Sequence, residues 1–466
     1  MIPEINSAPT YYNGYKLREY SGNPLIEALK PPPETDEEAV NRLLLLPEFQ
    51  PEDRDLSKAE KVECVNRLRH FMFPMKRQVS IFRSVYDLIF AGLVSRNPLA
   101  FNRLQDQYGS KRVLAPVRSP RQTSYYRPAQ LSLIVGPSGV GKTVLAHGIM
   151  HAMGENIIKH YEYQSKPFTE TQITYLHTNV PGNCNARNLC GRFIAEVDAL
   201  LQSNFYSENY DGKYITKDEY LEQFQRIISE LHVGGLFVDE IQNLSIGRSG
   251  GKEDLIAFLV NIRDKIGIPI ILIGTNKVAQ LLTGEMALVR RLLDGGIHHI
   301  EPFASPNDKS WLSFCEATWG FQWLKEPSQF TTKIGWKLFE FSAGIPALML
   351  DLFQKSQKRA INSNKEYINE QSLIDTYNDE MKEAHELIEG VKRGDKKILQ
   401  GYEDYYFEIK STCKKEQEQQ AEIEEIIQAF KRGSERARGK ESELNKLNNK
   451  ELLSALSKNL KEKETK

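Results

Sequence analysis

A short apolar run followed directly by a glycine-rich loop constrains this chain more than any other feature. Residues 131–135 read LSLIV, and residues 136–143 read GPSGVGKT, which fits the pattern G-x-x-x-x-G-K-[ST]. A helix-forming segment, 143–153, comes next. A strand before the motif and a helix behind it favour a phosphate-binding loop over a chance glycine-rich turn. The sequence therefore predicts an α/β unit built around a phosphate site.

The residue types of this loop suit a nucleoside triphosphate. Glycines let the backbone pass close to the ligand, so that successive N–H groups and the helix N-terminus face phosphate oxygens. We expect Lys142 to reach the β and γ phosphates of ATP, and Thr143 to offer its hydroxyl to Mg²⁺. The residues predicted to contact the nucleotide are Gly136, Pro137, Ser138, Gly139, Val140, Gly141, Lys142, Thr143 and Val144.

Strands and helices alternate from Gln130 onward. Unbroken apolar runs between helical patterns indicate a parallel sheet covered by helices on both faces, hence an α/β fold. The predicted strands are 131–135, 173–178, 236–239, 268–274 and 297–302. The predicted helices between them are 143–153, 186–202, 254–265 and one that ends at Leu293.

Two carboxylates end one of these strands. Residues 236–240 read LFVDE, which places Asp239 and Glu240 at the end of a buried strand, as a Walker B element requires. We expect Asp239 to hold Mg²⁺, directly or through water, and Glu240 to polarise the attacking water. Taken alone, the pair could be two solvated acids; the phosphate loop upstream favours the catalytic interpretation.

Two polar elements farther along complete the predicted site. Thr275 and Asn276 follow the apolar run 268–274, where Asn276 can orient water or the γ-phosphate, or can simply cap a helix. Arg290 and Arg291 lie on the next helix. An arginine pair on a helix is usually a solvated surface, but this position favours an arginine finger that reaches a neighbouring subunit's nucleotide. The predicted catalytic residues are Lys142, Glu240, Asn276, Arg290 and Arg291.

The segments on either side of the α/β module, 126–303, have a different character. Residues 1–125 carry scattered proline and tyrosine and two amphipathic helical patterns separated by Pro74, and we predict an interaction region there. Strands cease after the module, and aromatic-rich helical patterns predict a helical lid over 304–390. Residues 391–466 alternate in charge and are predicted to be a flexible tail. Its basic cluster is either a solvated charge run or a partner-docking peptide; the members are Lys431, Arg432, Arg436, Arg438 and Lys440.

Bulk composition excludes several classes of protein. The 466 residues hold 61 Lys plus Arg against 62 Asp plus Glu, so any DNA contact requires a local patch rather than net charge. The longest apolar run is far shorter than the roughly 20 residues that span a bilayer. The first residues of the chain lack the basic and then apolar order of a signal peptide. The five cysteines have no metal-binding spacing, and their odd number argues against a disulfide framework. We expect a cytoplasmic protein with no membrane partner.

In their order and spacing, these motifs resemble those of the AAA+ ATPases. More closely, the sequence looks like the transposition-regulator ATPases of the TnsC type, which bacterial cut-and-paste transposons carry. Five segments carry this similarity: YSGNPLIEALKPP (20–32), FPMKRQVSIFRSVYDLIFAGLVSRNPL (73–99), GPSGVGKT (136–143), LFVDEIQNL and ILIGTNKV. One departure concerns the lid, where AAA+ proteins often carry a sensor arginine in a Gly-x-x-Arg setting. This chain reads SAGIPALML there, with Ala347 after Pro346.

The resemblance implies an ATP-dependent homo-oligomer, a ring or helical filament, that wraps duplex DNA in association with the bacterial nucleoid. It implies that this assembly links a target-selector protein to the transposase subunits and comes apart on hydrolysis. It also implies that the start of helix 186–202 and the loop after it face the DNA; the matching positions are Arg187, Arg192, Lys213 and Thr216. A hydrated surface is the alternative for these residues. Two other functions stay open: an AAA+ replication initiator or helicase loader, and a scaffold that binds ATP without turnover.

Overall fold

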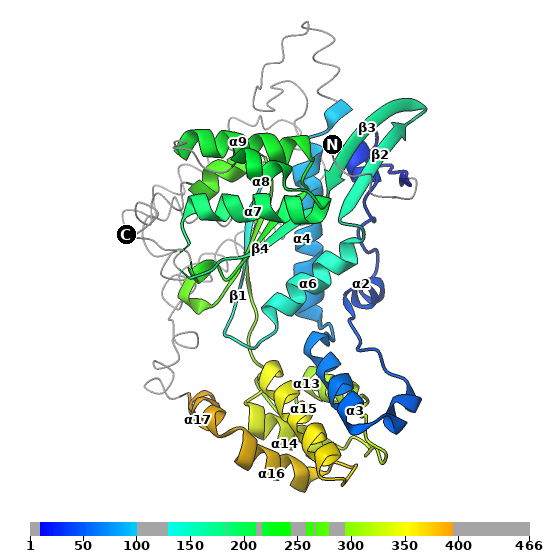
Figure 1. The fold of residues 1–466 in the computed structure, drawn as a ribbon, viewed down its shortest axis with the longest axis vertical. Helices are drawn as coiled ribbons and strands as arrows, with labels where there is room; N and C mark the ends of the chain where they lie inside the picture. Colours follow the sequence, from blue (N-terminus) through cyan, green and yellow to red (C-terminus); the bar gives the residue numbers. More distant parts are fainter. Residues whose placement is uncertain are drawn as a thin grey trace, which may run out of the picture. The chain divides into compact units, whose positions relative to one another are not determined.

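A parallel sheet of five strands organises the structure, a computed structural model (Figure 1). The described residues are 10–99, 129–182, 184–210, 217–243, 258–264, 267–278 and 294–394, and all lie in the structural unit Met1–Phe407. The strands are β4 (Tyr175–Asn179), β5 (Gly235–Asp239), β6 (Ile270–Gly274), β1 (Leu131–Val135) and β7 (Ile297–His299), given in their spatial order. Every neighbouring pair is parallel. The predicted α/β class is confirmed.

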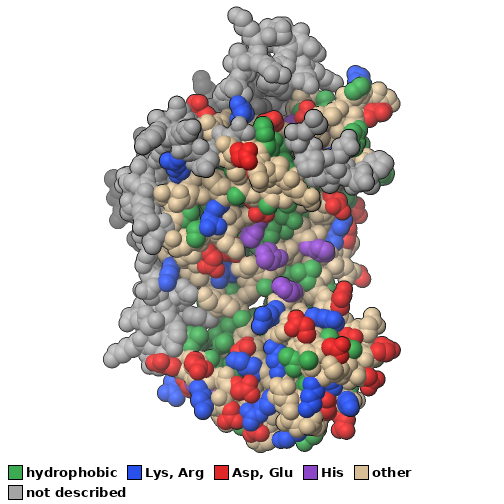
Figure 2. Space-filling model, in the orientation of Figure 1, with side chains coloured by type: hydrophobic (Ala, Val, Ile, Leu, Met, Phe, Trp, Pro, Cys, Tyr) green, Lys and Arg blue, Asp and Glu red, His purple; other side chains and the backbone are tan. Residues whose placement is uncertain are grey.

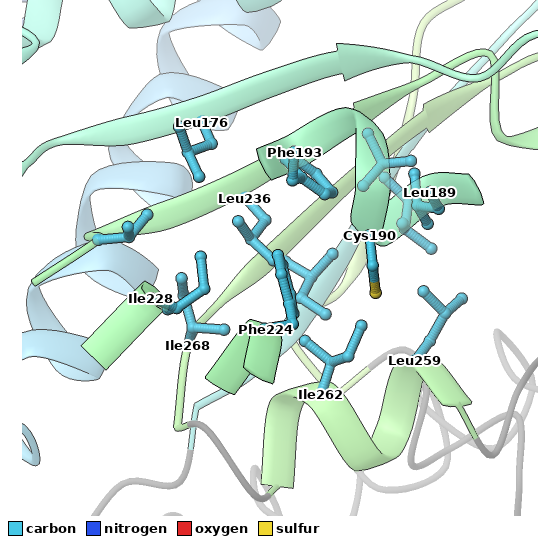
Figure 3. Packing of buried hydrophobic residues seen from close by; sticks show 14 of the residues in the cluster. Leu176, Leu189, Cys190, Phe193, Phe224, Ile228, Leu236, Leu259, Ile262 and Ile268 are labelled. Atoms are coloured by element: carbon cyan, nitrogen blue, oxygen red, sulfur yellow. The ribbon is translucent and has the colours of Figure 1, made fainter. Parts of the chain in front are cut away.

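Helices cover both faces of the sheet because side chains alternate along each strand. On one face, Leu176 and Leu236 pack with residues of α7 (Ala186–Leu201) and α9 (Lys217–Glu230), including Phe193 and Phe224 (Figure 3). The short α8 (Phe205–Tyr210) lies on the same face, where Tyr206 joins this core. On the other face, Ile134, Phe237 and Ile271 pack against α4 (Lys76–Val94) and α6 (Lys142–Met153).

An antiparallel hairpin lies between α6 and β4, where the sequence pattern predicted no strand. Its strands are β2 (Ile157–Tyr163) and β3 (Lys166–Ile173), joined through Gln164 and Ser165, both with positive φ. A two-residue turn with positive φ at both positions usually contains Gly or Asn. This turn contains neither residue, so the sequence pattern did not predict it. The strand predicted over 173–178 begins two residues later, at Tyr175, because Ile173 ends the hairpin.

The N-terminal helices divide between two hydrophobic cores. After α1 (Pro24–Glu27), helices α2 (Asp36–Leu43) and α4 pack in the sheet core. Helix α3 (Lys58–Asn66) instead packs with the helices that follow the sheet. Lys61 of α3, with a side chain only 1% exposed, places its Nζ 2.7 and 2.8 Å from the two carboxylate oxygens of Glu366. Helices of the predicted interaction region, residues 1–125, thus contribute side chains to both hydrophobic cores.

Among the described residues, five α-helices follow the sheet, in the segment that the sequence predicts to be a helical lid. They are α13 (Lys309–Trp319), α14 (Thr332–Ser342), α15 (Pro346–Asn362), α16 (Glu370–Glu380) and α17 (His385–Arg393). Their core is rich in aromatic side chains, with Trp311, Trp319 and Trp323 buried. Lys and Arg alternate with Asp and Glu over the surface of these helices and α3 (Figure 2). In the described part of the chain, no helix is both long and apolar enough to cross a membrane. The predicted tail beyond residue 394 lies outside the described residues.

Candidate nucleotide site

The carboxyl ends of β5, β6 and β1 bring the predicted site residues to one edge of the sheet. Val135 pairs with Gly274, and Val238 pairs with Leu272, so the three strands end almost level. The strand order puts β6 between the phosphate loop, after β1, and the carboxylate pair, after β5. Ligands in open α/β sheets bind outside this edge.

The phosphate loop, residues 136–143, is shaped by its backbone. Gly139 and Gly141 adopt φ of +84° and +91°, a region that strains other residues, and Gly141 caps the N-terminus of α6. At Gly136, a Cβ atom would lie 2.0 Å from the Ile300 carbonyl oxygen, so only glycine fits. The Gly136 N–H also donates to the Gly274 carbonyl (3.3 Å), which ties the loop to β6.

Lys142 and Thr143 begin α6 and face the site. The Lys142 ammonium group is largely buried and donates to the Pro137 carbonyl within the loop, at 2.7 Å. The Thr143 hydroxyl donates to Asp239 Oδ2 at 2.7 Å, across 96 positions of sequence. Asp239 is 2% exposed, and its other oxygen, Oδ1, accepts the backbone N–H of Glu240 at 2.7 Å. The two predicted Mg²⁺ ligands are therefore adjacent, and a hydroxyl beside a carboxylate is a donor set that suits this hard cation.

Glu240 lies at the exposed side of the same strand end. Its φ of +57° turns the chain sharply after β5, and its Oε2 accepts a hydrogen bond from the side-chain amide of Gln242. The Gln242 Oε1 in turn accepts the backbone N–H of Thr275 at 3.1 Å. Sequence reasoning did not single out Gln242, although its amide lies within the LFVDEIQNL segment.

The end of β6 supplies a polar group with an unmet hydrogen-bond requirement. Thr275 is buried, and its hydroxyl has no hydrogen-bond partner among the described residues. A buried hydroxyl without a partner costs free energy unless a ligand or water satisfies it. The hydroxyl lies at the end of β6, between the strand ends that carry the phosphate loop and Asp239, where a ligand or a water can satisfy it. Asn276, the predicted catalytic amide, begins the short 3₁₀ turn η5 (Asn276–Val278) and is half-buried.

The predicted lid contacts the phosphate loop at Ala347, the position that matches the arginine of the Gly-x-x-Arg pattern. The Ala347 N–H donates to the Gly139 carbonyl at 3.0 Å. A Cβ atom on Gly139 would meet the Ile345 side chain at 3.0 Å and that of Ala347 at 3.2 Å. A backbone N–H and a methyl group therefore occupy the expected arginine position. At this position, a backbone hydrogen bond joins the predicted lid to the phosphate loop.

Two histidines adjoin the carboxylate side of the site and were not predicted. His147 of α6 and His177 of β4 make an edge-to-face ring contact, with centroids 5.3 Å apart. Burial lowers the pKa of His177, the nearby His147 lowers it further, and Asp239 opposes them. The His177 Nε2 is buried without a partner among the described residues. Burial therefore favours the neutral form of the His177 ring beside Asp239.

The remaining predicted residues fall into two groups. Arg187 and Arg192 are both exposed on α7, but they lack the i,i+3 or i,i+4 spacing that would place them on one helix face. Asn185 caps this helix by accepting the Asn188 N–H at 2.8 Å. Lys213, Thr216, Arg290 and Arg291 lie outside the described residues.

Comparison with known proteins agrees with this geometry. Residues 126–282 match the family model described as an AAA domain. A search of curated proteins found no match. Similar solved structures include the Walker-type ATPase paby2304 of Pyrococcus abyssi, with 14% identity, a TM-score of 0.37, and coverage of 58% of this chain and 71% of that chain.

Two further solved structures are also similar. Cdc6p from Pyrobaculum aerophilum has 15% identity and a TM-score of 0.35, over 51% of this chain and 57% of that one. The RuvB Holliday junction branch migration motor of Thermotoga maritima has 16% identity and a TM-score of 0.32, over 53% of this chain and 61% of that one. The chain thus spans less than two thirds of these two proteins. These likenesses are too distant to transfer a function.

The family match and the sheet with its phosphate loop agree on one segment of the chain. Residues 126–282 are similar to an AAA domain, and their described part has a P-loop α/β fold.

Proposed function

We propose that this chain binds ATP with Mg²⁺ at the edge formed by β1, β5 and β6, and hydrolyses it. The observation that carries the proposal is the 2.7 Å hydrogen bond between Thr143 and Asp239, beside the buried Lys142 and the exposed Glu240. These four groups come from the loop after β1 and the end of β5. They supply oxygen ligands, a cation and a carboxylate base in one place.

Each side chain has a distinct part in this reaction. Bound Mg²⁺ would neutralise charge on the phosphates, with Thr143 and Asp239 as its protein ligands. Lys142 would exchange the Pro137 carbonyl for phosphate oxygens, because a charged acceptor makes the stronger hydrogen bond. Glu240 would accept the proton of the attacking water. Asn276 would orient that water or the γ-phosphate, and Arg290 or Arg291 would reach the site of the next subunit.

We propose further that ATP binding assembles the chain into an oligomer on duplex DNA, which links a target selector to the transposase, and that hydrolysis disassembles it. The support for this finer role is the sequence similarity to TnsC-type regulators. Arg187 and Arg192 are the described candidates for phosphate contacts, and the similarity adds Lys213 and Thr216, which lie outside the described residues. Phosphate contacts give binding that tolerates any sequence and weakens with salt.

The two N-terminal segments that carry this similarity contact each other. The Asn23 amide donates to the Leu93 carbonyl at 3.0 Å, and the Asn97 amide donates to the Gly22 carbonyl at 3.1 Å. The rings of Tyr20 and Phe90 also meet edge to face. The similarity therefore falls on two segments that fold together against the sheet, rather than on scattered positions.

Paired variants of the site test both levels of the proposal. Glu240→Gln should slow phosphate release on the order of 100-fold and trap oligomers on DNA in ATP. Lys142→Ala should weaken nucleotide binding on the order of 100-fold and prevent those oligomers from forming. Lys337→Ala, on the lid surface, serves as the lysine control and should match the wild type. Identical DNA binding by both site variants, measured by imaging and filter binding, would refute ATP-gated assembly. Transposition with purified transposase and selector then tests the finer role.

A further inference from the structure

The turn that follows β5 is clamped to the strands on either side by two amide side chains. The turn is the 3₁₀ segment η3 (Ile241–Asn243). On the β4 side, the Asn243 amide donates to the Val180 carbonyl at 2.9 Å. On the β6 side, the Gln242 Oε1 accepts the Thr275 N–H at 3.1 Å. Two consecutive amides thus join three adjacent strand ends.

A glycine in β6 makes room for the second of these contacts. A Cβ atom at Gly274 would lie 2.7 Å from the Gln242 Oε1, and equally close to side-chain carbons of Ile241 and Val278. Any other residue at this position would push the Gln242 carbonyl away from the Thr275 N–H. The close approach of the turn to β6 therefore depends on this glycine.

The same Gln242 side chain also holds Glu240. Its amide nitrogen donates to the Glu240 Oε2, while its oxygen stays bonded to Thr275. An exposed glutamate otherwise samples several rotamers, and holding one of them costs conformational entropy. Gln242 restricts that freedom through an uncharged donor, and among the described residues no hydrogen bond to the Glu240 Oε1 competes with a water.

We infer that Gln242 is a positioning residue for hydrolysis: it fixes the Glu240 carboxylate at a set place relative to the end of β6. The inference rests on the proposed ATPase function. The Asn243 side-chain amide donates to the Val180 carbonyl, and its backbone N–H donates to the Glu240 carbonyl. Neither bond involves the Glu240 carboxylate, so Asn243 steadies the turn without orienting that group. A general base must lie within hydrogen-bond reach of the water that it activates, and a loosely held carboxylate meets this condition less often.

Three variants separate positioning from general support of the turn. Gln242→Met keeps the length but removes both hydrogen bonds, whereas Gln242→Glu keeps the acceptor for Thr275 and removes only the donor to Glu240. We expect each to lower kcat about 10-fold, with KM for ATP and affinity for a non-hydrolysable ATP analogue unchanged. Asn243→Ala should lower the melting temperature but keep kcat within about twofold of the wild type, because it loosens the turn alone.

Melting of the nucleotide-free protein provides a readout that does not depend on activity. Gln242→Glu sets two carboxylates side by side, so we expect its melting temperature to fall by about 2–4 °C. In a Glu240→Gln background the same change should cost almost nothing, because the amide at 240 can donate to the new carboxylate.

Three outcomes would overturn the inference while wild-type hydrolysis stands. They are wild-type kcat in both Gln242 variants, a KM that rises as much as kcat falls, and a melting penalty that is equal in the two backgrounds. Absence of phosphate release from the wild-type protein would instead overturn the proposed function, and the positioning role with it.

Discussion

The phosphate loop and the turn after β5 lie on the same edge of the sheet but are held in different ways. The loop is fixed by its backbone, through glycines with positive φ and hydrogen bonds of main-chain groups to Gly274 and Ala347. The turn is fixed by side chains, through the amides of Gln242 and Asn243. Substitutions in the loop should therefore disturb folding and ligand binding together. Substitution of Gln242 in the turn should act on the Glu240 carboxylate with a smaller effect on stability, whereas substitution of Asn243 should lower stability alone.

The largest expected effect belongs to the loop. Gly136→Ala would place a methyl group 2.0 Å from the Ile300 carbonyl oxygen, and because the two nearest atoms belong to the backbone, they leave little room to relax. We expect a loss of about 3 kcal/mol or more in the free energy of unfolding, measured by chemical denaturation. The control is Gly191→Ala, inside α7, where a Cβ atom meets nothing within 4 Å. That change should stabilise by about 0.5–1 kcal/mol. Equal stability of the two variants would contradict a backbone-determined loop.

The next effect concerns the buried Thr275 hydroxyl, whose removal should change stability and phosphate release in opposite directions. Thr275→Val keeps the shape but removes a hydroxyl that has no partner among the described residues. We expect the nucleotide-free protein to gain up to about 1 kcal/mol, because an unsatisfied buried group is removed. Phosphate release should fall about 10-fold if the hydroxyl serves the bound ligand. Lower stability together with unchanged turnover would mean that the hydroxyl is merely structural.

The smallest effect belongs to the turn. Asn243→Ala removes the 2.9 Å hydrogen bond to the Val180 carbonyl, and a net contribution of about 1 kcal/mol is expected for such a bond. Thermal unfolding with and without an ATP analogue measures this loss. We expect the same shift in both conditions, because Asn243 faces β4. A variant that lost nucleotide affinity instead would show that the turn and the loop are less separate than their contacts indicate.

The main features of the fold followed from local sequence patterns. Apolar runs located the five sheet strands, and helical periodicity predicted helices after the sheet without their bounds, because burial of those side chains decides their conformation. The hairpin β2–β3 was missed, because its turn at Gln164 and Ser165 lacks the glycine or asparagine that normally marks one. The division of the N-terminal helices between two cores was also beyond the sequence. Periodicity shows that α3 and α4 each have an apolar face but not which surface covers it.

In the candidate site, too, the sequence predicted some features and only the tertiary structure decided others. Eight consecutive residues determine the phosphate loop, because its shape depends on glycine backbone freedom and on the strand and helix that flank it. The carboxylate pair was also predictable from its place at the end of an apolar strand. Only the tertiary structure decided what these groups contact. The strand order put Thr143 beside Asp239 and Gln242 beside Thr275, and the packing of the helices after the sheet put Ala347 beside Gly139. Those contacts join residues far apart in the chain, and their partners depend on how the strands and the lid pack rather than on any local pattern.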